Sequence, residues 1–484
     1  MGAIMRAAAI LFAFVCLVAH PAFADSPQAK PVQGKVSNAK FIAYGQPVLA
    51  FTHAEIIDGT GTAPRYDQTL VVRRGRIAAL GPFAGTAIPK GATIIDARGK
   101  TLLPGFVMVH EHLFYPLGGA NYSGMLETFP PLYLAGGTTT ARTAGTVSPY
   151  GDLEVKKAIA AGKMIGPDLD VTGPYIQGPG LPILKMHVLQ GPDDAKRTVD
   201  YWAYEGATSF KGYMNLTRAE LGAAIKAAHA HHMKMTAHLC SITYREAAAL
   251  GIDDLEHGFA VMTDFVTGKQ PDACPKDGNM KSLVDLNPND PRLKALMQFL
   301  IDRHVAITST LTVFETFTPG RPEAPLGARE LLMPQLRHDY ETAWAAGPKN
   351  PRFKPWAVVF PKLMQMERMY VAMGGTLLAG TDPTGYGGVL PGYSGKREVQ
   401  LLREAGFSMP QAIQIATLNG ARYLGRDKDV GSLAAGKRAD IALVAGDPDK
   451  DARALDSMPY VFKAGVGYNT KAIFAAMKGE VGLR

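Results

Sequence analysis

Eight short apolar runs alternate with helical stretches through most of the chain, and this alternation restricts the folds that it can adopt. Strands and helices repeated in this order predict parallel strands joined by crossover helices. A closed barrel of this type contains eight such strands. The expected fold class is therefore α/β, a (β/α)8 TIM-like barrel over residues 104–425. The predicted strands are residues 106–109, 138–142, 168–172, 208–213, 233–237, 254–256, 305–308 and 376–379.

The segments on either side of the predicted barrel have another pattern. Residues 48–103 alternate short strands with turn signals such as Asp58-Gly59, and short strands return within residues 426–484. Together these segments predict a small β-sandwich domain formed by both chain ends. The polar residues 25–47 are expected to be a linker. Inside the barrel segment, residues 259–292 and 314–356 are expected to be long loops without regular structure, which usually cover a site.

The first 24 residues have the composition of a secretory signal peptide. Arg6 supplies a positive charge, residues 7–18 are apolar, and Ala22-Phe23-Ala24 predicts cleavage near Ala24-Asp25. The protein is therefore expected to be secreted or periplasmic. Export leaves Cys240 and Cys274, and the sequence leaves open whether these two thiols form a disulfide.

Composition excludes several classes of partner. The formal charge of +8 is spread over 484 residues without a basic run interleaved with aromatics, which argues against nucleic-acid binding. Hydrophobic residues make up 47% of the chain, as in ordinary globular proteins. No apolar run after the signal peptide reaches the roughly 20 residues of a membrane span. We therefore expect no stable membrane insertion.

A His-x-His pair ends the first predicted barrel strand. Residues two apart in a strand point to the same side, so His110 and His112 face one way and Glu111 the other. The carboxyl ends of barrel strands form the mouth at which barrel enzymes carry out their chemistry. Taken alone, the pair fits either two metal ligands or two buried histidines that bond to the backbone.

Four further residues with ligand chemistry lie at the ends of other predicted strands. They are Lys211, His238, His257 and Asp382. A lysine inside an apolar strand is costly to bury as an ammonium, and desolvation favours its neutral amine. That amine can react with carbon dioxide to give a carbamate, which is an anionic oxygen ligand. The coincidence of all these residues at strand ends predicts a metal site.

Several motifs around these residues are similar to those of the amidohydrolase superfamily, and within it to the imidazolonepropionase-like and Xaa-Pro dipeptidase-like branch. The resemblance covers about residues 48–484. The motifs are TLLPG before His110-Glu111-His112, GTTTAR at 137–142, LEHG at 255–258, LAGTD at 378–382, NGARYLG at 419–425, GSL at 431–433 and GKRAD at 436–440.

This resemblance implies a binuclear site with two divalent metal ions, most often zinc. His110, His112 and Asp382 would bind one ion, His238 and His257 would bind the other, and Lys211, carboxylated on its side-chain nitrogen, would bridge them. Imidazole nitrogen and anionic oxygen suit zinc. The implied reaction is hydrolysis of a C–N bond rather than an ester bond, with Asp382 as the catalytic base. The substrate would be a small molecule or short peptide-like compound, such as a dipeptide or an N-acyl amino acid.

The chain departs from the family pattern at two places. Met108 stands where many members carry an aspartate, which predicts altered support of the ligands rather than loss of metal. Peptidase-like members often place a substrate-contacting histidine near the position of Tyr175; that histidine is absent here unless Tyr175 or His187 takes its place, which argues against peptidase specificity. Tyr213 and Arg142, at the ends of two strands, are further candidate substrate contacts. Arg142 would bind a substrate carboxylate or pair with a neighbouring acid.

Two other functions stay open. The first is a mononuclear deaminase or cyclic-amide hydrolase of the same superfamily, in which Lys211 is an unmodified lysine. The second, from another class, is an inactive barrel used for binding. A barrel that has lost its chemistry typically loses ligands, whereas this chain retains all six. Self-association as a homo-oligomer is common among proteins of this kind and is also open.

Overall fold

The eight predicted strands are all present. The computed structural model describes residues 38–117, 121–180 and 186–482, so the predicted signal peptide and residues 25–37 of the linker lie outside the described residues. Each apolar run contains or overlaps a strand, because these runs are rich in residues that pack on both faces of a buried sheet. The strands are β7 (Phe106–Glu111), β10 (Thr138–Thr143), β11 (Asp168–Asp170), β12 (Ser209–Gly212), β13 (Lys234–Ala237), β14 (Asp254–Glu256), β15 (Ala306–Ser309) and β16 (Leu377–Ala379).

These strands pair in parallel and in chain order, in one sheet β7-β10-β11 and another β12-β13-β14-β15-β16. Two isolated bridges, Thr172 with Ser209 and Ile176 with Gly212, join the segment after β11 to β12 of the second sheet. At the other seam, the backbone N–H groups of Thr381 and Asp382 donate to the His110 carbonyl at 3.0 and 3.1 Å. The α/β class is thus confirmed, while full closure into a barrel stays a prediction.

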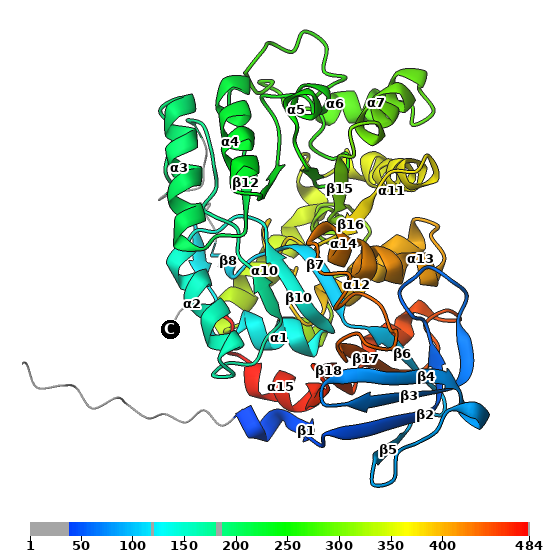
Figure 1. Cartoon of the computed structure of the whole chain (residues 1–484). Helices are drawn as coiled ribbons and strands as arrows, with labels where there is room; N and C mark the ends of the chain where they lie inside the picture. The colour runs from blue at the N-terminus through cyan, green and yellow to red at the C-terminus, as the bar shows by residue number, and fades with distance from the viewer. Residues whose placement is uncertain (1–37, 118–120, 181–185, 483–484) are drawn as a thin grey trace, which may run out of the picture. The chain divides into compact units, whose positions relative to one another are not determined.

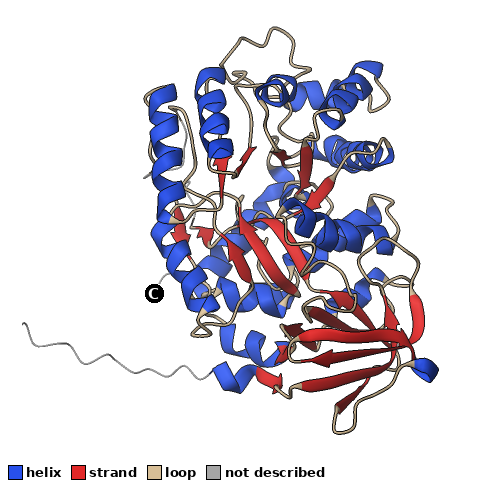
Figure 2. Cartoon of the chain, viewed as in Figure 1, coloured by secondary structure: helices blue, strands red, loops and turns tan. Residues whose placement is uncertain are grey.

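Helices flank the parallel strands in the upper part of Figures 1 and 2. Capping boxes begin α4 and α13 at Thr217 and Ser408, as the sequence indicates. The helices are α1 (Phe129–Ala135), α2 (Pro149–Ala160), α3 (Pro192–Glu205), α4 (Arg218–Ala230), α5 (Tyr244–Leu250), α6 (Met280–Asp285), α7 (Pro291–Ile301), α8 (Leu311–Thr316), α9 (Leu326–Arg329), α10 (Pro334–Ala346), α11 (Trp356–Ala372), α12 (Ser394–Glu404), α13 (Met409–Gln414), the π-helix η4 (Ile415–Asn419) and α14 (Gly420–Tyr423).

The two expected long loops contain regular structure. Residues 314–356 include α9 and α10, and residues 259–292 include α6. The expectation of structureless loops was therefore wrong. These helices are short or expose most of their surface, with Tyr340 the buried residue of α10, so they lack the broad apolar stripe by which a helix is recognised in a sequence.

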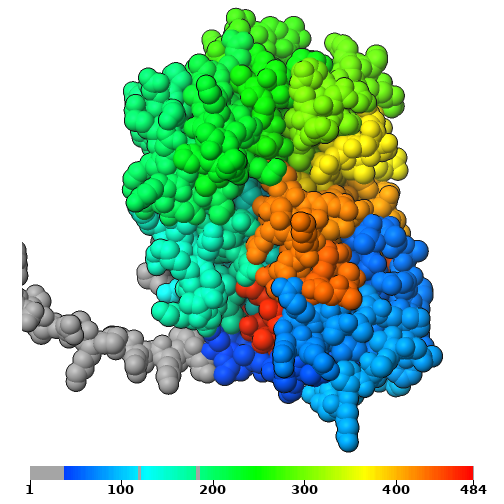
Figure 3. Space-filling view, in the orientation of Figure 1, coloured from blue at the N-terminus to red at the C-terminus, as the bar shows by residue number. Residues whose placement is uncertain are grey.

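Strands from both chain ends form a nine-stranded sheet, at the lower right of Figure 1. They are hydrogen-bonded into one sheet rather than the two sheets of a sandwich. Figure 3 shows the N-terminal (blue) and C-terminal (orange and red) segments side by side at this end of the molecule. The strands are β1 (Ile42–Tyr44), β2 (Val48–Ile56), β3 (Arg65–Arg73), β4 (Arg76–Pro82), β5 (Thr93–Asp96), β6 (Lys100–Pro104), β17 (Ile441–Ala445), β18 (Tyr460–Lys463) and β19 (Val466–Asn469).

Part of the expected linker belongs to this sheet. Residues Asn38–Phe41 form a 3-10 helix, and β1 pairs with β19. Phe41 is buried against Ile473 of the last helix, α15 (Thr470–Met477). This apolar contact anchors residues 38–44 to the sheet, although most of the expected linker is polar.

Cys240 and Cys274 form a disulfide, with their Cα atoms 5.0 Å apart, so the pairing that the sequence left open does occur. The bond ties the residues after β13 to the segment that contains α6. Among the described residues, no helix combines the length and apolarity that crossing a membrane requires.

Candidate metal centre

The six residues of the predicted metal site lie at the carboxyl ends of five strands. His110 is in β7 with His112 just beyond it, and Lys211 is in β12. His238 and His257 directly follow β13 and β14, and Asp382 follows β16 by three residues. His110, His112, Lys211, His257 and Asp382 are all buried, with at most 7% of their surface exposed. The fold thus brings together side chains that are up to 272 positions apart in the sequence.

Three of these residues form a compact donor group. One ligand atom from each of His110, His112 and Asp382 lies within 4.8 Å of the others. Asp382 Oδ1 is 3.3 Å from His112 Nε2 and 3.7 Å from His110 Nε2. Two imidazole nitrogens and a carboxylate oxygen directed at one point are a donor set that binds zinc and similar ions.

Hydrogen bonds on the far side of each ring leave the inner nitrogen available. His112 Nδ1 donates to the Gly145 carbonyl at 3.1 Å, so His112 Nε2 keeps its lone pair. His110 Nδ1 lies 2.5 Å from Glu256 Oε2. Metal-binding histidines characteristically donate their outer N–H to a carbonyl or carboxylate in this way. The residues present therefore fit a divalent metal.

Lys211, His238 and His257 lie against the same group. Lys211 Nζ is 3.2 Å from His110 Nε2. The His257 ring centroid is 4.5 Å from that of His238 and 4.6 Å from that of His110. His257 Nδ1 lies 3.7 Å from Asp382 Oδ2 and 3.0 Å from Thr310 Oγ1. The second predicted ligand set is thus adjacent to the first.

The protonation states suit metal binding. Burial lowers the pKa of His112 to about 4 and that of His238 to about 3, so both are neutral at pH 7. Burial also lowers the pKa of Lys211. Burial opposes ionisation of Asp382, yet the surrounding histidines, led by His110, hold its pKa well below the usual range. Neutral imidazoles and an ionised carboxylate are the forms that coordinate a cation.

Two of the candidate ligands have strained backbones. His257 and Asp382 have φ values of 72° and 51°, in the left-handed region that residues with a Cβ rarely adopt. Such conformations persist only where the surrounding structure fixes them, and they cluster at functional sites. Both residues occupy the turn after a strand of the parallel sheet, β14 or β16, where this backbone directs the side chain toward the centre.

Arg142 is not a substrate contact. It is fully buried below the site, where its guanidinium donates to Glu256 Oε1, Ser209 Oγ, Thr236 Oγ1 and the Val109 carbonyl at 2.8–3.2 Å. Of the two roles that the sequence left open, pairing with a neighbouring acid is therefore the observed one. That acid, Glu256, also holds the His110 ring.

A cavity of about 200 Å³ opens beside the centre. Tyr175 and Tyr213 line it, as expected of substrate contacts. His187 does not: it is half-exposed and pairs with Asp194 at 2.7 Å, so its predicted role was wrong. The described residues that line it are His112, Phe114, Tyr122, Tyr175, Lys211, Tyr213, His238, His257, Val313, Phe314, Phe317, Asp382, Thr384 and Gly385.

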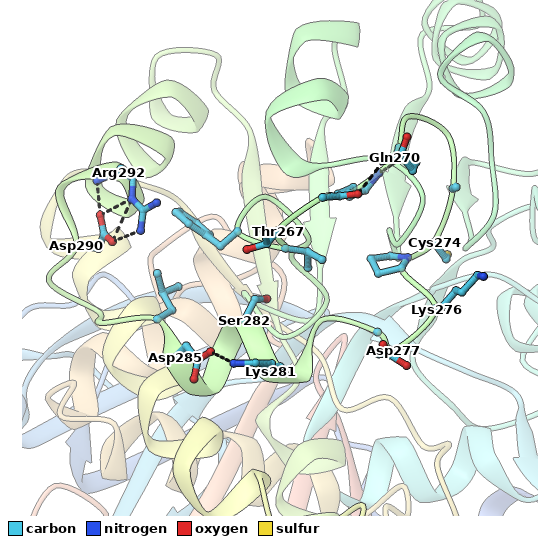
Figure 4. A pocket seen from close by; sticks show the side chains of 18 of the residues that line it. Thr267, Gln270, Cys274, Lys276, Asp277, Lys281, Ser282, Asp285, Asp290 and Arg292 are labelled. Atoms are coloured by element: carbon cyan, nitrogen blue, oxygen red, sulfur yellow. Dashed lines mark hydrogen bonds and ion pairs between the residues drawn. The ribbon is translucent and has the colours of Figure 1, made fainter.

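A larger hollow of about 700 Å³ lies away from the centre, under the segment that carries the disulfide (Figure 4). Four of its charged lining residues form two ion pairs, Lys281 with Asp285 and Arg292 with Asp290. None of the six candidate ligands lines this hollow. The described residues of its walls all lie within 265–292, so we assign the chemistry to the smaller cavity.

Sequence reasoning missed Glu256, Gly145 and Thr310, which hold the ligand rings. Glu256 carries a signal, because an acid within a buried strand requires a partner. The Gly145 carbonyl and the Thr310 hydroxyl carry none, since their roles depend on contacts between separate strands. Phe114, Tyr122, Phe314 and Phe317 were also missed, because isolated aromatic residues in loops and short helices are common.

Comparison with known proteins identifies the fold. Residues 361–480 match the amidohydrolase family. Over 87% of its length, the chain superposes on the whole of a Xaa-Pro dipeptidase with bound methionine in its active site, with a TM-score of 0.66 and 20% identity. The chain has the amidohydrolase fold. The ochratoxinase of A. niger shares this amidohydrolase-type architecture, with a TM-score of 0.61 and 18% identity over 86% of this chain and 94% of that one. The resemblance read from the sequence motifs is confirmed.

Matches to curated proteins by sequence are partial. A dihydroorotase of Mycobacterium tuberculosis is 39% identical over 95 residues, which are 20% of this chain and 21% of that enzyme. An N-acyl-D-aspartate deacylase of Alcaligenes xylosoxydans xylosoxydans is 49% identical over 59 residues, 12% of this chain and 11% of that enzyme. The matched region thus spans about a fifth or less of the length of these relatives.

Proposed function

We propose that this protein is a metal-dependent hydrolase that cleaves a C–N bond. The observation that carries the proposal is the convergence of His110, His112 and Asp382, with the outer nitrogen of each histidine engaged by Glu256 or by the Gly145 carbonyl. The amidohydrolase match and the names of the similar proteins, a dipeptidase and a deacylase among them, support the same class.

We further propose two metal ions, of which zinc is the expected identity. The support is a second set of candidate ligands, Lys211, His238 and His257, next to the first. Lys211 Nζ lies 3.2 Å from His110 Nε2. The ring centroid of His257 lies 4.6 Å from that of His110 and 4.5 Å from that of His238. Lys211 is 1% exposed and its Nζ lies beside His110 Nε2, where a carboxylated side chain would place an anionic oxygen between the two sets. Bound divalent ions supply Lewis acidity to the carbonyl and to water.

The protein side chains would then move the proton. The Asp382 carboxylate accepts a proton from the attacking water and returns it to the leaving nitrogen. Oxygen from water bonds to the carbonyl carbon and the C–N bond breaks, giving a carboxylic acid and an amine. The hydroxyl of Tyr175, 3.5 Å from His112 Nε2, faces the same space and can orient the substrate.

The metal count of purified protein separates this proposal from the mononuclear alternative. Two ions per chain, falling to one or fewer in Lys211→Met, support the binuclear site. A ¹³C carbamate signal after incubation with ¹³C-bicarbonate, absent from Lys211→Met, supports the modified lysine. One ion per chain in both proteins, with retained activity, would favour the mononuclear deaminase or cyclic-amide hydrolase.

Export is also proposed, on the signal-peptide pattern of residues 1–24. The disulfide between Cys240 and Cys274 supports an oxidising compartment. Fractionation of expressing cells, with the N-terminus of the mature protein determined by mass spectrometry, tests this. The expected first residue is Asp25, and a cytosolic protein that begins at Met1 would exclude export.

A further inference from the structure

The cavity beside the metal centre has aromatic walls on two sides. On one side, Phe114 stacks on His112 at 4.3 Å between ring centroids, and Tyr122 meets Phe114 edge-on at 5.1 Å. These rings belong to the hairpin of β8 (Phe114–Pro116) and β9 (Tyr122–Gly124). Because each ring packs on another, the wall is held in a fixed orientation.

The opposite wall comes from α8 and the residue that follows it. Phe314 meets His257 edge-on at 5.8 Å and stacks on Trp356 at 5.1 Å. Phe317 stacks on the same tryptophan at 5.8 Å. Ring faces and edges on both sides of a cavity bind another aromatic ring well, since offset-stacked and edge-to-face contacts between rings add to the gain from the buried area.

Among the described residues of the lining, the charged groups belong to the metal centre itself, namely Lys211, the ligand histidines and Asp382. Guanidinium groups in the neighbourhood are already paired. Arg142 donates to Glu256 below the centre, and Arg397 donates to Glu315 at 2.7 and 2.8 Å, in a separate cavity on the other side of α8. A substrate carboxylate in this cavity would therefore lose its hydration without gaining, among the described residues, a cationic side chain outside the metal centre, which is costly.

Neutral hydrogen-bonding groups take the place of a charge. Tyr122, Tyr175 and Tyr213 all line the cavity, and the ring centroids of Tyr175 and Tyr213 lie 5.0 Å apart. Phenol hydroxyls donate to a carbonyl oxygen without requiring a charged substrate. The volume of about 200 Å³ is below the roughly 300–1,000 Å³ of pockets for drug-sized ligands, so it suits a compound with a single ring.

From this lining we infer that the substrate is a small, uncharged amide that carries one aromatic ring, rather than a dipeptide or N-acyl amino acid with a free carboxylate. The ring lies between the Phe114–Tyr122 and Phe314–Phe317 walls, and the amide carbonyl faces the tyrosine hydroxyls. Hydrolysis adds water across the C–N bond and releases a carboxylic acid and an amine. The inference rests on the proposed C–N hydrolase function and names its substrate class.

Matched substrates test the inference with the zinc-loaded full chain. One pair is 4-methylacetanilide and 4-acetamidobenzoate, and the other is N-acetyl-L-phenylalaninamide and N-acetyl-L-phenylalanine. In each pair the scissile bond is shared and one member carries a carboxylate. We expect kcat/KM at least tenfold higher for the neutral member of each pair. An equal or higher value for the anionic members would overturn the inference while leaving the hydrolase function intact. Hydrolysis of none of the four would instead contradict the proposed function.

The second test reverses the preference between neutral and anionic substrates by adding a positive charge to the cavity wall. Tyr122→Arg places a guanidinium in the cavity wall, and we expect the ratio of kcat/KM for 4-acetamidobenzoate to that for 4-methylacetanilide to rise at least tenfold. Phe317→Lys adds a cation to the wall formed by α8 and the residue after it. This second variant tests the same expectation if Tyr122→Arg does not fold. The matched control is Tyr204→Arg, which adds the same charge at a residue 88% exposed on α3. A ratio unchanged in both folded cavity variants, or raised equally in the control, would contradict the inference.

Discussion

Glu256 connects His110 of the candidate metal centre to the buried guanidinium of Arg142. Its two carboxylate oxygens contact His110 on one side and Arg142 with Thr236 on the other. Burial alone would raise the pKa of Glu256, but His110, Lys211 and Arg142 hold it well below the usual range. The carboxylate therefore stays ionised in a fully buried position and fixes which nitrogen of His110 faces the candidate metal site.

Replacement of this carboxylate should weaken metal binding. Glu256→Gln leaves the Arg142 guanidinium without its anion, and we expect a loss of about 3–5 kcal/mol in unfolding free energy. Loss of the partner of a ligand histidine typically lowers metal affinity about 10–100-fold. Chelator competition measures the affinity. Glu55→Gln, in the sheet of both chain ends, removes another buried carboxylate and should leave the affinity unchanged. Equal affinity in Glu256→Gln and wild type would exclude this role.

A second buried acid, Asp152, predicts a pH dependence of stability. It is 2% exposed and bonds to Thr146, and burial raises its pKa to about 7. The folded state thus binds more protons than the unfolded state between about pH 4 and pH 7. The contribution of this group to stability is present below that window and is lost as the pH rises through it.

Asp152→Asn should therefore stabilise the protein at pH 8 by as much as about 4 kcal/mol, and the difference should disappear near pH 4. Denaturant unfolding at both pH values measures it. Asp277→Asn, at an exposed loop residue, is the control and should have no such dependence. A constant difference between Asp152→Asn and wild type at both pH values would contradict the assignment.

At the scale of elements, the disulfide ties the turn after β13 to the segment before α6. Cys240 lies two residues beyond His238, and the bond spans 34 positions of sequence. Closing a loop of that length removes about 4 kcal/mol of chain entropy from the unfolded state in the loop-entropy model. The bond therefore stabilises the side of the centre that carries His238.

The double variant Cys240→Ser/Cys274→Ser should lower the unfolding free energy by up to about 4 kcal/mol. Reduction of the wild type should give the same loss, with two free thiols counted by mass spectrometry. In the variant, the reductant should have no further effect. Unchanged stability after complete reduction would show that the bond does not constrain this region.

The strands and the ligands could be predicted from the sequence for one physical reason: both are local patterns. The run before His110 and Glu111 is apolar because that strand is buried on both faces, and each candidate ligand lies at the end of such a run or within three residues of it. Glu256, Gly145 and Thr310 could not be assigned roles, because they act across strands. Residues 334–346 were missed as a helix, since α10 buries little and shows no clear apolar stripe.

At the scale of the whole molecule, the two chain ends build one sheet and the residues between them build the site. β6 pairs with both β2 and β17, so the strand that leads into β7 is held by segments from both ends. Gly105, between β6 and β7, donates its N–H to the Asp440 carbonyl at 2.9 Å. The position of His110 is thus coupled to the sheet at the opposite end of β7.

The metal content of the purified full chain tests the central claim most directly. Elemental analysis after zinc loading and removal of free metal should give two ions per chain for wild type, and one or fewer for His110→Ala and for Asp382→Ala. Hydrolysis of a neutral amide should rise and fall with that content. Wild-type protein that is folded but binds no metal, or that keeps full amide hydrolysis after complete chelation, would contradict the account.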